Sequence, residues 1–378
     1  MKKVLTISLV MLLLVTSLAG CAGNNEGYEI TLITDKGNID DKSFNQGSWE
    51  GVVAFAEEEN IPHTYIKPEE DTDDGYLAAI DLAVTGGAEV IVTPGFLFEV
   101  AIYQAQTKYP DVKFILLDGQ PRTADYSVFE TKENVASIMY SEEQSGYLAG
   151  YAAVIDGMTN LGFMGGMAVP AVQAFGYGFL QGAEDAAKEL GLADGSIKVI
   201  YHYTGNFAET DTNKATAKTM YQEGVEVIFA CGGSVGKSVM SAASEAETKV
   251  IGVDVDQRYD SDTVITSATK GLKASVVSVL ESIYEENWKE FSGKTTYFNA
   301  GNDGVGLPTV VIGDKNADAF DRFDTFDKEA YDEIFSKLAD GSISVRRNIE
   351  VEDPTGYATK EELTISLGLE KVSVTTRQ

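Results

Sequence analysis

The sequence predicts an α/β protein made of two doubly wound, Rossmann-like lobes joined by a hinge. Short runs rich in β-branched residues alternate with longer amphipathic stretches, which is typical of parallel strands connected by crossover helices. This alternation runs once to about residue 140 and again from about residue 160, without detectable sequence repetition. The 378 residues are enough for two lobes of ordinary domain size.

The predicted strands and helices follow one another in regular order. The expected strands are Tyr28–Thr34, Thr64–Lys67, Val90–Thr93, Lys113–Leu117, Asn160–Gly165, Lys198–Tyr203, Val225–Ala230 and Lys249–Val253. The expected helices are Ser43–Glu59, Gly75–Thr85, Tyr147–Asp156, Val172–Leu190, Asp211–Glu223, Gly236–Glu245 and Lys328–Leu338. Residues 296–325 are rich in Gly, Asp and Asn with little periodicity, so we expect a long connection or an extra hairpin outside the main sheets.

The amino terminus has the features of an export signal. Met1–Lys3 is short and basic, Val4–Val15 is mostly apolar, and small residues precede Cys21. Leu18–Cys21 resembles a bacterial lipobox, in which the cysteine carries lipid. We therefore predict a signal peptide over residues 1–20, lipid attachment at Cys21 and a lipid-anchored tether over 21–27, on the outer face of a bacterial cell membrane. The alternative is an ordinary secretory signal with a chance cysteine.

The rest of the chain divides into three parts. We expect residues 28–155 to form lobe 1, residues 156–285 to form lobe 2, and residues 286–378 to return and complete both lobes. If Cys21 carries lipid, the second cysteine of the chain, Cys231, has no partner. Hydrophobic cores, not disulfides, must then stabilise the fold.

The composition limits the possible partners. The chain has 59 acidic against 29 basic residues, a formal net charge of −30. Such a surface repels nucleic acid and anionic lipid headgroups. We therefore expect no nucleic-acid partner, and we attribute the charge to solubility and not to the choice of ligand.

Three motifs suggest catalysis or metal binding, but each is incomplete. Cys231–Ser238 nearly matches a P-loop, yet Cys231 replaces the first glycine. Residues 314–318 alternate as in a calcium loop, but the glycine of the sharp turn is missing. His63 and His202 lie far apart in the sequence, and neither is beside a suitable nucleophile. We predict no enzyme activity, no metal and no cofactor.

Carboxylates, glycines and an aromatic residue follow the predicted strands. Open parallel sheets bind ligands beyond the carboxyl ends of their strands, so these positions are the candidates for a binding site. They hold Asp35, Asp118, the turn Gly205–Phe207, Gly232–Gly233 and Asp254. Two such edges facing each other would form a cleft for a small molecule.

Several motifs together resemble the basic membrane protein family of bacterial lipoproteins. They stand in the family's order at Asp40–Gly51, Glu142–Ala153, Gly162–Met167, Val172–Phe179 and Val250–Gln257. The resemblance implies a periplasmic-binding-protein fold of type I and a substrate-binding protein that delivers purine nucleosides to the permease subunits of an ABC importer. Inosine, guanosine and adenosine are the expected ligands.

The resemblance also implies roles for individual residues. Phe44 and Phe207 match the two phenylalanines that sandwich the base, and Asp118 and Asn45 match the residues that read the base edge. The ribose would be bound by Asp254, Lys270 and the backbone of Gly232–Gly233.

The chemistry of these residue types is consistent with those roles. Aromatic rings suit a flat heterocycle, and a carboxylate accepts hydrogen bonds from a ring N–H. Ribose hydroxyls need an acceptor and a charged donor close together. The same architecture could instead bind another solute, such as a sugar, or act as a signalling receptor, because the fold alone does not separate these functions.

Overall fold

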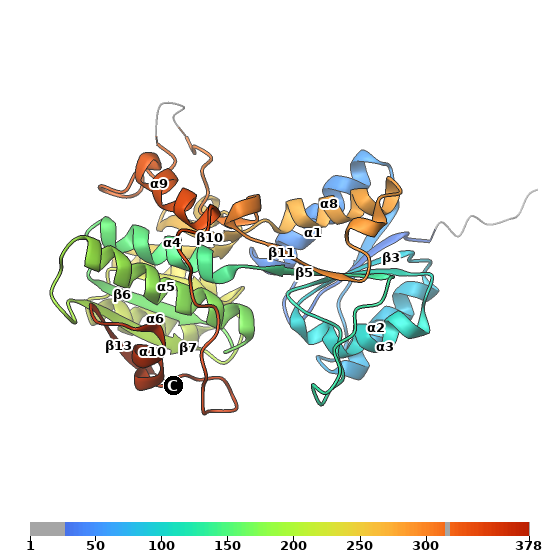
Figure 1. Ribbon diagram of the computed structural model, residues 1–378, viewed down its shortest axis with the longest axis horizontal. Helices are drawn as coiled ribbons and strands as arrows, with labels where there is room; N and C mark the ends of the chain where they lie inside the picture. Colours follow the sequence, from blue (N-terminus) through green and yellow to red (C-terminus); the bar gives the residue numbers. More distant parts are fainter. Residues whose placement is uncertain (1–26, 314–317, 378) are drawn as a thin grey trace, which may run out of the picture.

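The computed structural model describes residues 27–313 and 318–377, which form two α/β lobes side by side (Figure 1). The predicted signal peptide, Cys21 and most of the tether lie outside these residues.

The sheet of lobe 1 has six parallel strands in the order β11-β5-β4-β3-β1-β2. The strands are β1 (Ile30–Ile33), β2 (His63–Ile66), β3 (Val90–Pro94), β4 (Lys113–Leu117), β5 (Val135–Tyr140) and β11 (Lys294–Phe298). Helices cover both faces, which is why the central strands are continuous apolar runs. One face carries α1 (Phe44–Glu58) and α8 (Leu272–Tyr284), and the other carries α2 (Asp73–Thr85) and α3 (Glu99–Lys108) (Figure 1).

The sheet of lobe 2 has seven strands in the order β12-β10-β9-β8-β6-β7-β13, and only β12 is antiparallel. The strands are β6 (Asn160–Gly165), β7 (Ile197–Tyr203), β8 (Val227–Cys231), β9 (Lys249–Asp254), β10 (Val264–Lys270), β12 (Val305–Gly306) and β13 (Val372–Arg377). The helices α4 (Glu142–Ile155) and α5 (Pro170–Glu189) cover one face, and α6 (Asp211–Gln222) and α7 (Val235–Ala246) cover the other. Near the carboxyl terminus lie α9 (Lys328–Ala339) and α10 (Lys360–Leu367).

The chain crosses between the lobes three times: after β5, after β10 and after β11. The expected boundaries near residues 155 and 285 therefore fall one helix too late, because α4 belongs to lobe 2 and α8 to lobe 1. Helix α4 packs so closely on α5 that a Cβ on Gly182 would lie 1.9 Å from the carbonyl oxygen of Tyr147. Helix α8 packs along α1. Hydrophobic periodicity predicts a helix but does not say which sheet the helix will cover.

The predicted fold class is confirmed, and all eight predicted strands form with ends shifted by at most two residues. The sequence did not predict β5, β10, β11, β12 and β13, nor α3, α8 and α10. The prediction for residues 296–325 was also wrong. Strand β11 joins the sheet of lobe 1 beside β5, and β12 pairs with β10 in lobe 2.

Candidate ligand-binding site

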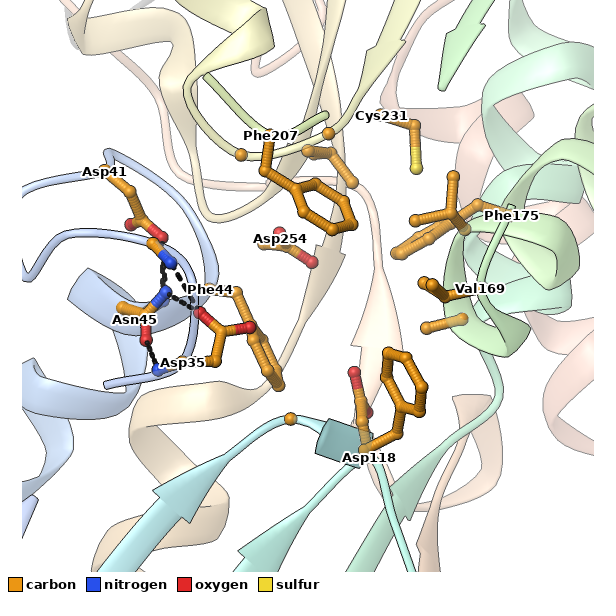
Figure 2. A pocket seen from close by; sticks show the side chains of 18 of the residues that line it. Asp35, Asp41, Phe44, Asn45, Asp118, Val169, Phe175, Phe207, Cys231 and Asp254 are labelled. Carbon is orange, nitrogen blue, oxygen red and sulfur yellow. Dashed lines mark hydrogen bonds between the residues drawn. The ribbon is translucent and has the colours of Figure 1, made fainter. Parts of the chain in front are cut away.

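A pocket lies between the lobes, at the carboxyl ends of the strands of both sheets (Figure 2). Its empty volume is about 770 Å³, including space open to solvent, which is within the range of small-molecule sites. All nine predicted ligand-binding residues line it: Asp35, Phe44, Asn45, Asp118, Phe207, Gly232, Gly233, Asp254 and Lys270. Strand ends and helix starts carry them, so the topology brings together residues that are far apart in sequence.

Lobe 1 contributes a hydrogen-bonded carboxylate cluster built around Asn45. The side-chain nitrogen of Asn45 donates to Asp35 Oδ1 and to Asp41 Oδ2, each at 2.9 Å. Asp41 also accepts from the backbone N–H groups of Ser43, Asn45 and Gln46, and so caps α1. Asn45 therefore holds the loop before α1 in place, which leaves its amide less free to read a base edge than the sequence suggested.

Asp35 presents a second oxygen to the pocket. Its Oδ1 accepts from Gly37 N and from Asn45, while the other oxygen points toward the cavity (Figure 2). Burial raises the pKa of Asp35 to about 6, although its hydrogen bonds act in the opposite direction. The carboxyl group can therefore accept a hydrogen bond from a ligand at neutral pH and can donate one under acidic conditions.

Asp118 follows β4 and Asp254 ends β9, and both residues have an unusual backbone conformation. Their φ angles are +56° and +66°, in the left-handed region that costs most residues energy. Asp tolerates this region better than β-branched residues do. Both side chains line the pocket, one from each lobe. The strained backbone therefore turns two carboxylates toward the same cavity.

Lys270 connects the carboxylates of the two lobes. Its Nζ lies 2.5 Å from Asp118 Oδ2, 3.2 Å from Glu142 Oε1 and 3.8 Å from Asp254 Oδ1. Burial alone would lower the pKa of Lys270, but these three carboxylates raise it above its ordinary value. Burial raises the pKa of Asp118 to about 7, against the opposing effect of Lys270. Asp118 Oδ1 is buried and has no hydrogen-bond partner in the described part of the chain, which leaves it available to a ligand.

The two predicted aromatic residues come from opposite lobes. Phe44 begins α1 in lobe 1, and Phe207 lies in the loop after β7 in lobe 2. Both rings are half-buried and border the cavity (Figure 2). The ring of Phe207 lies over the backbone of Gly166, where a Cβ would come within 2.5 Å of it. The Nζ of Lys270 lies 4.7 Å from the centre of the Phe44 ring, within range of a cation–π interaction.

The apolar part of the pocket was missed by the sequence reading. The loop after β6 and the start of α5 contribute Val169–Val172, and Phe175 follows on the same helix. Phe96 and Leu97, in the short helix after β3, line the lobe 1 side. Each group follows a correctly predicted strand. Ligands bind beyond the carboxyl ends of parallel strands, so the positions of both groups in the sequence are a signal for apolar as well as polar ligand contacts.

Hydrogen bonds join the lobes beside the pocket. Ser43 Oγ donates to the Asp254 carboxylate. Gln257 Nε2 donates to the carbonyl oxygen of Lys42 at 2.7 Å, and Lys237 Nζ reaches the carbonyl oxygen of Asp40 at 3.1 Å. Residues 40–43 of lobe 1 are therefore bound by three separate elements of lobe 2.

The incomplete catalytic motifs have other surroundings in the structure. The Cys231–Ser238 segment is the end of β8, a turn and the start of α7, and Gly232 and Gly233 in its turn line the pocket. Neither His63 nor His202 lines it. Within residues 27–313 and 318–377, no three His, Cys, Asp or Glu side chains are grouped to hold a metal ion. Most of the calcium-loop-like segment at 314–318 lies outside the described residues.

Fold and pocket define a two-lobed solute-binding protein, and the comparisons name its family. The profile "ABC transporter substrate-binding protein PnrA-like" matches residues 29–345. The chain therefore belongs to the PnrA-like, or Bmp, family of ABC transporter substrate-binding proteins.

Relatives agree with this assignment. The chain is 28% identical over 338 residues to the "ABC transporter nucleoside-binding protein BmpA" of Lactococcus lactis subsp. cremoris, covering 81% of this chain and 91% of that protein. It is 30% identical to "Basic membrane protein D" of Borreliella burgdorferi, covering 79% and 84%. An ABC transporter solute-binding protein from Aeropyrum pernix K1 has the same fold, with a TM-score of 0.71, 22% identity and coverage of 86% and 94%.

The chain is thus the substrate-binding component of an ABC transporter, a class that works outside the cytoplasm with permease subunits. In the part of the chain that the structure describes, no helix has both the length and the apolar character needed to cross a membrane.

Proposed function

We propose that this protein captures purine nucleosides, namely inosine, guanosine and adenosine, between its lobes and delivers them to the permease subunits of an ABC importer. We further propose that lipid on Cys21 anchors it to the outer face of the cell membrane. The observation that carries the ligand proposal is the pair Phe44 and Phe207, which border one cavity from opposite lobes.

The aromatic pair suits a planar base. Each stacked ring contributes about 1–3 kcal/mol to the binding of a base. The unpaired Oδ1 of Asp118 and the cavity-facing oxygen of Asp35 can accept hydrogen bonds from ring or exocyclic N–H groups. Purine bases present such donors on their edges.

The part of the cavity beside Asp254 and Lys270 suits a ribose. Asp254 supplies an acceptor and Lys270 a charged donor, with 3.8 Å between their nearest charged atoms. The turn Gly232–Gly233 brings backbone close to the cavity without a side chain. A relative's name, "nucleoside-binding protein", is in line with this ligand class.

The test is a thermal-shift and calorimetric screen of the chain from residue 22 onward. Inosine, guanosine and adenosine are expected to raise the unfolding temperature and to bind one per chain. Free ribose, glucose and free bases should bind much more weakly, since each fills only part of the site. A sugar or other solute that binds more tightly than every nucleoside would overturn the proposal in favour of the alternative ligand classes.

The screen should also separate nucleosides from nucleotides. Among residues 27–313 and 318–377, four carboxylates line the pocket, from Asp35, Asp41, Asp118 and Asp254, and Lys270 is the one basic lining residue. Lys270 is already paired, so a phosphate would be buried without a cation. Adenosine monophosphate should therefore bind much more weakly than adenosine, and equal titration curves would contradict this.

The anchor is tested separately. Radioactive palmitate should label the expressed full-length chain, and Cys21→Ala should abolish the label and release the protein from the membrane fraction. Membrane retention of the unlabelled variant would contradict lipid attachment at Cys21.

A further inference from the structure

Arg347 lies outside the pocket but reaches the first crossover between the lobes. It belongs to the irregular connection between α9 and α10, and its side chain is only 20% exposed. Its Nη1 donates to the carbonyl oxygen of Tyr140 at 2.6 Å and to Glu143 Oε2 at 2.8 Å, and it also bonds Glu142 Oε2. Tyr140 ends β5 and Glu142 begins α4, so Arg347 holds this crossover in place.

Glu142 links Arg347 to the pocket. Its side chain is fully buried, with one oxygen bonded to Arg347 and the other 3.2 Å from Lys270 Nζ. Lys270 ends β10, where the chain makes its second crossover. One buried carboxylate therefore joins the arginine outside the pocket to the ammonium inside it, and it connects two of the three crossovers.

Lys270 faces more negative charge than it can neutralise alone. Asp118, Glu142 and Asp254 all place an oxygen within 4 Å of its Nζ. A buried carboxylate without a cation is strongly unfavourable, so the three compete for the same ammonium. Arg347 pairs with one oxygen of Glu142, so Glu142 attracts the Lys270 ammonium less strongly. In agreement, although burial alone would raise the pKa of Glu142, Lys270 and Arg347 hold it below its ordinary value.

We propose that Arg347 is a positioning residue for ligand binding: by pairing with Glu142 it leaves the Lys270 ammonium directed at Asp118 and at the ligand. This inference rests on the proposed function in one respect, namely that Lys270 contacts the bound nucleoside. Arg347 itself touches no ligand, and its effect passes through Glu142.

The first experiment compares two adjacent arginines. Arg347→Gln should weaken inosine binding about tenfold, because Glu142 then draws the Lys270 ammonium toward itself and away from the ligand. Arg346→Gln removes the same charge one residue away from an exposed side chain, and it should leave the affinity unchanged. Arg347→Lys keeps the charge and should restore most of the affinity. Equal affinities of the Arg347→Gln and Arg346→Gln variants would overturn the proposal.

A second substitution separates positioning from simple packing. If Arg347 acts by neutralising Glu142, then Glu142→Gln should suppress the defect, and the double variant should bind inosine more tightly than Arg347→Gln alone. A double variant that binds more weakly than either single variant would mean that Arg347 only packs the connection. If Arg347→Gln does not fold, recovery of folding and binding in the double variant supports the proposal, and an equally unfolded double variant refutes it.

A titration without ligand keeps this inference distinct from the proposed function. Carboxyl carbon NMR signals can be assigned by their loss in Asp118→Asn and Glu142→Gln. The coupled pair Asp118 and Glu142 should take up its proton at higher pH in Arg347→Gln than in Arg346→Gln, because a nearby positive charge is gone. If the two carboxyl groups titrate alike in Arg347→Gln and Arg346→Gln, the proposal that Arg347 acts through Glu142 is overturned. A shifted titration in a protein that binds no nucleoside would refute the proposed ligand instead.

Discussion

The two walls of the pocket differ in chemistry. Lobe 1 supplies three of the four carboxylates that line it, Asp35, Asp41 and Asp118, and two of these are held by Asn45. Lobe 2 supplies mainly apolar and glycine surface, from Val169–Val172, Phe175, Phe207 and Gly232–Gly233. The polar wall fixes hydrogen-bonding geometry before a ligand arrives, and the apolar wall supplies shape and excludes water. Because lobe 1 carries most of the carboxylates and lobe 2 most of the apolar surface, high affinity should require both lobes.

The largest expected effect comes from breaking the ion pairs that join the two walls. Lys270→Met removes the ammonium shared by Asp118, Glu142 and Asp254 and leaves buried carboxylates without their partner. We expect a loss of about 3–5 kcal/mol in the free energy of unfolding, together with loss of nucleoside binding. Urea unfolding and calorimetry measure the two effects.

The matched control is Lys273→Met, which removes a lysine exposed on α8. It should change neither stability nor affinity. If the Lys270→Met protein were as stable as this control, the ion pairs between the lobes would not contribute to the free energy of unfolding.

Truncating Phe44 and Phe207 tests whether each lobe supplies one aromatic ring that stacks on the ligand. Phe44→Ala and Phe207→Ala should each cost about 1–3 kcal/mol of binding, a ten- to hundredfold loss of affinity for inosine. Both rings are only half-buried, so the unfolding midpoint without ligand should change little.

Phe129→Ala, on an exposed loop of lobe 1, is the control for loss of a ring. If Phe44 and Phe207 instead served the core, truncation would lower the stability of the ligand-free protein by about 3–5 kcal/mol and leave affinity nearly intact. That result would remove the main reason for choosing a nucleoside.

The smallest expected effect is the contribution of Asp35, in the polar wall, to the pH dependence of stability in the ligand-free protein. Burial raises the pKa of Asp35 from 3.8 to about 6, so the folded state holds a proton that the unfolded state has released between these values. The contribution of Asp35 to stability is therefore present below pH 3.8 and is lost as the pH rises to about 6. Asp35→Asn should stabilise the ligand-free protein at pH 8 by on the order of 1 kcal/mol and have little effect at pH 3.5.

Unfolding midpoints across this pH range, with exposed Asp111→Asn as control, measure the difference. A difference between Asp35→Asn and the original protein that does not vary with pH would contradict the role of burial.

The sequence alone determined the two α/β lobes, because the periods of strands and helices are local properties. It also determined which strand ends carry candidate residues, and the structure brings all nine of them to one pocket. The motif containing Phe44 and the turn containing Phe207 could be recognised locally, although about 160 residues separate them.

Only the tertiary structure decided how these pieces combine. The sequences of α4 and α8 do not show which sheet each helix covers, and packing against α5 and α1 assigns each to a lobe. The motif that contains Asn45 predicts a ligand contact, yet its amide nitrogen donates hydrogen bonds to Asp35 and Asp41. The pairing of Lys270 with Asp118, Glu142 and Asp254, and of Glu142 with Arg347, depends on three crossovers and a returning carboxyl-terminal segment. Such long-range contacts leave no local pattern, because charged residues find their partners only after the chain has folded.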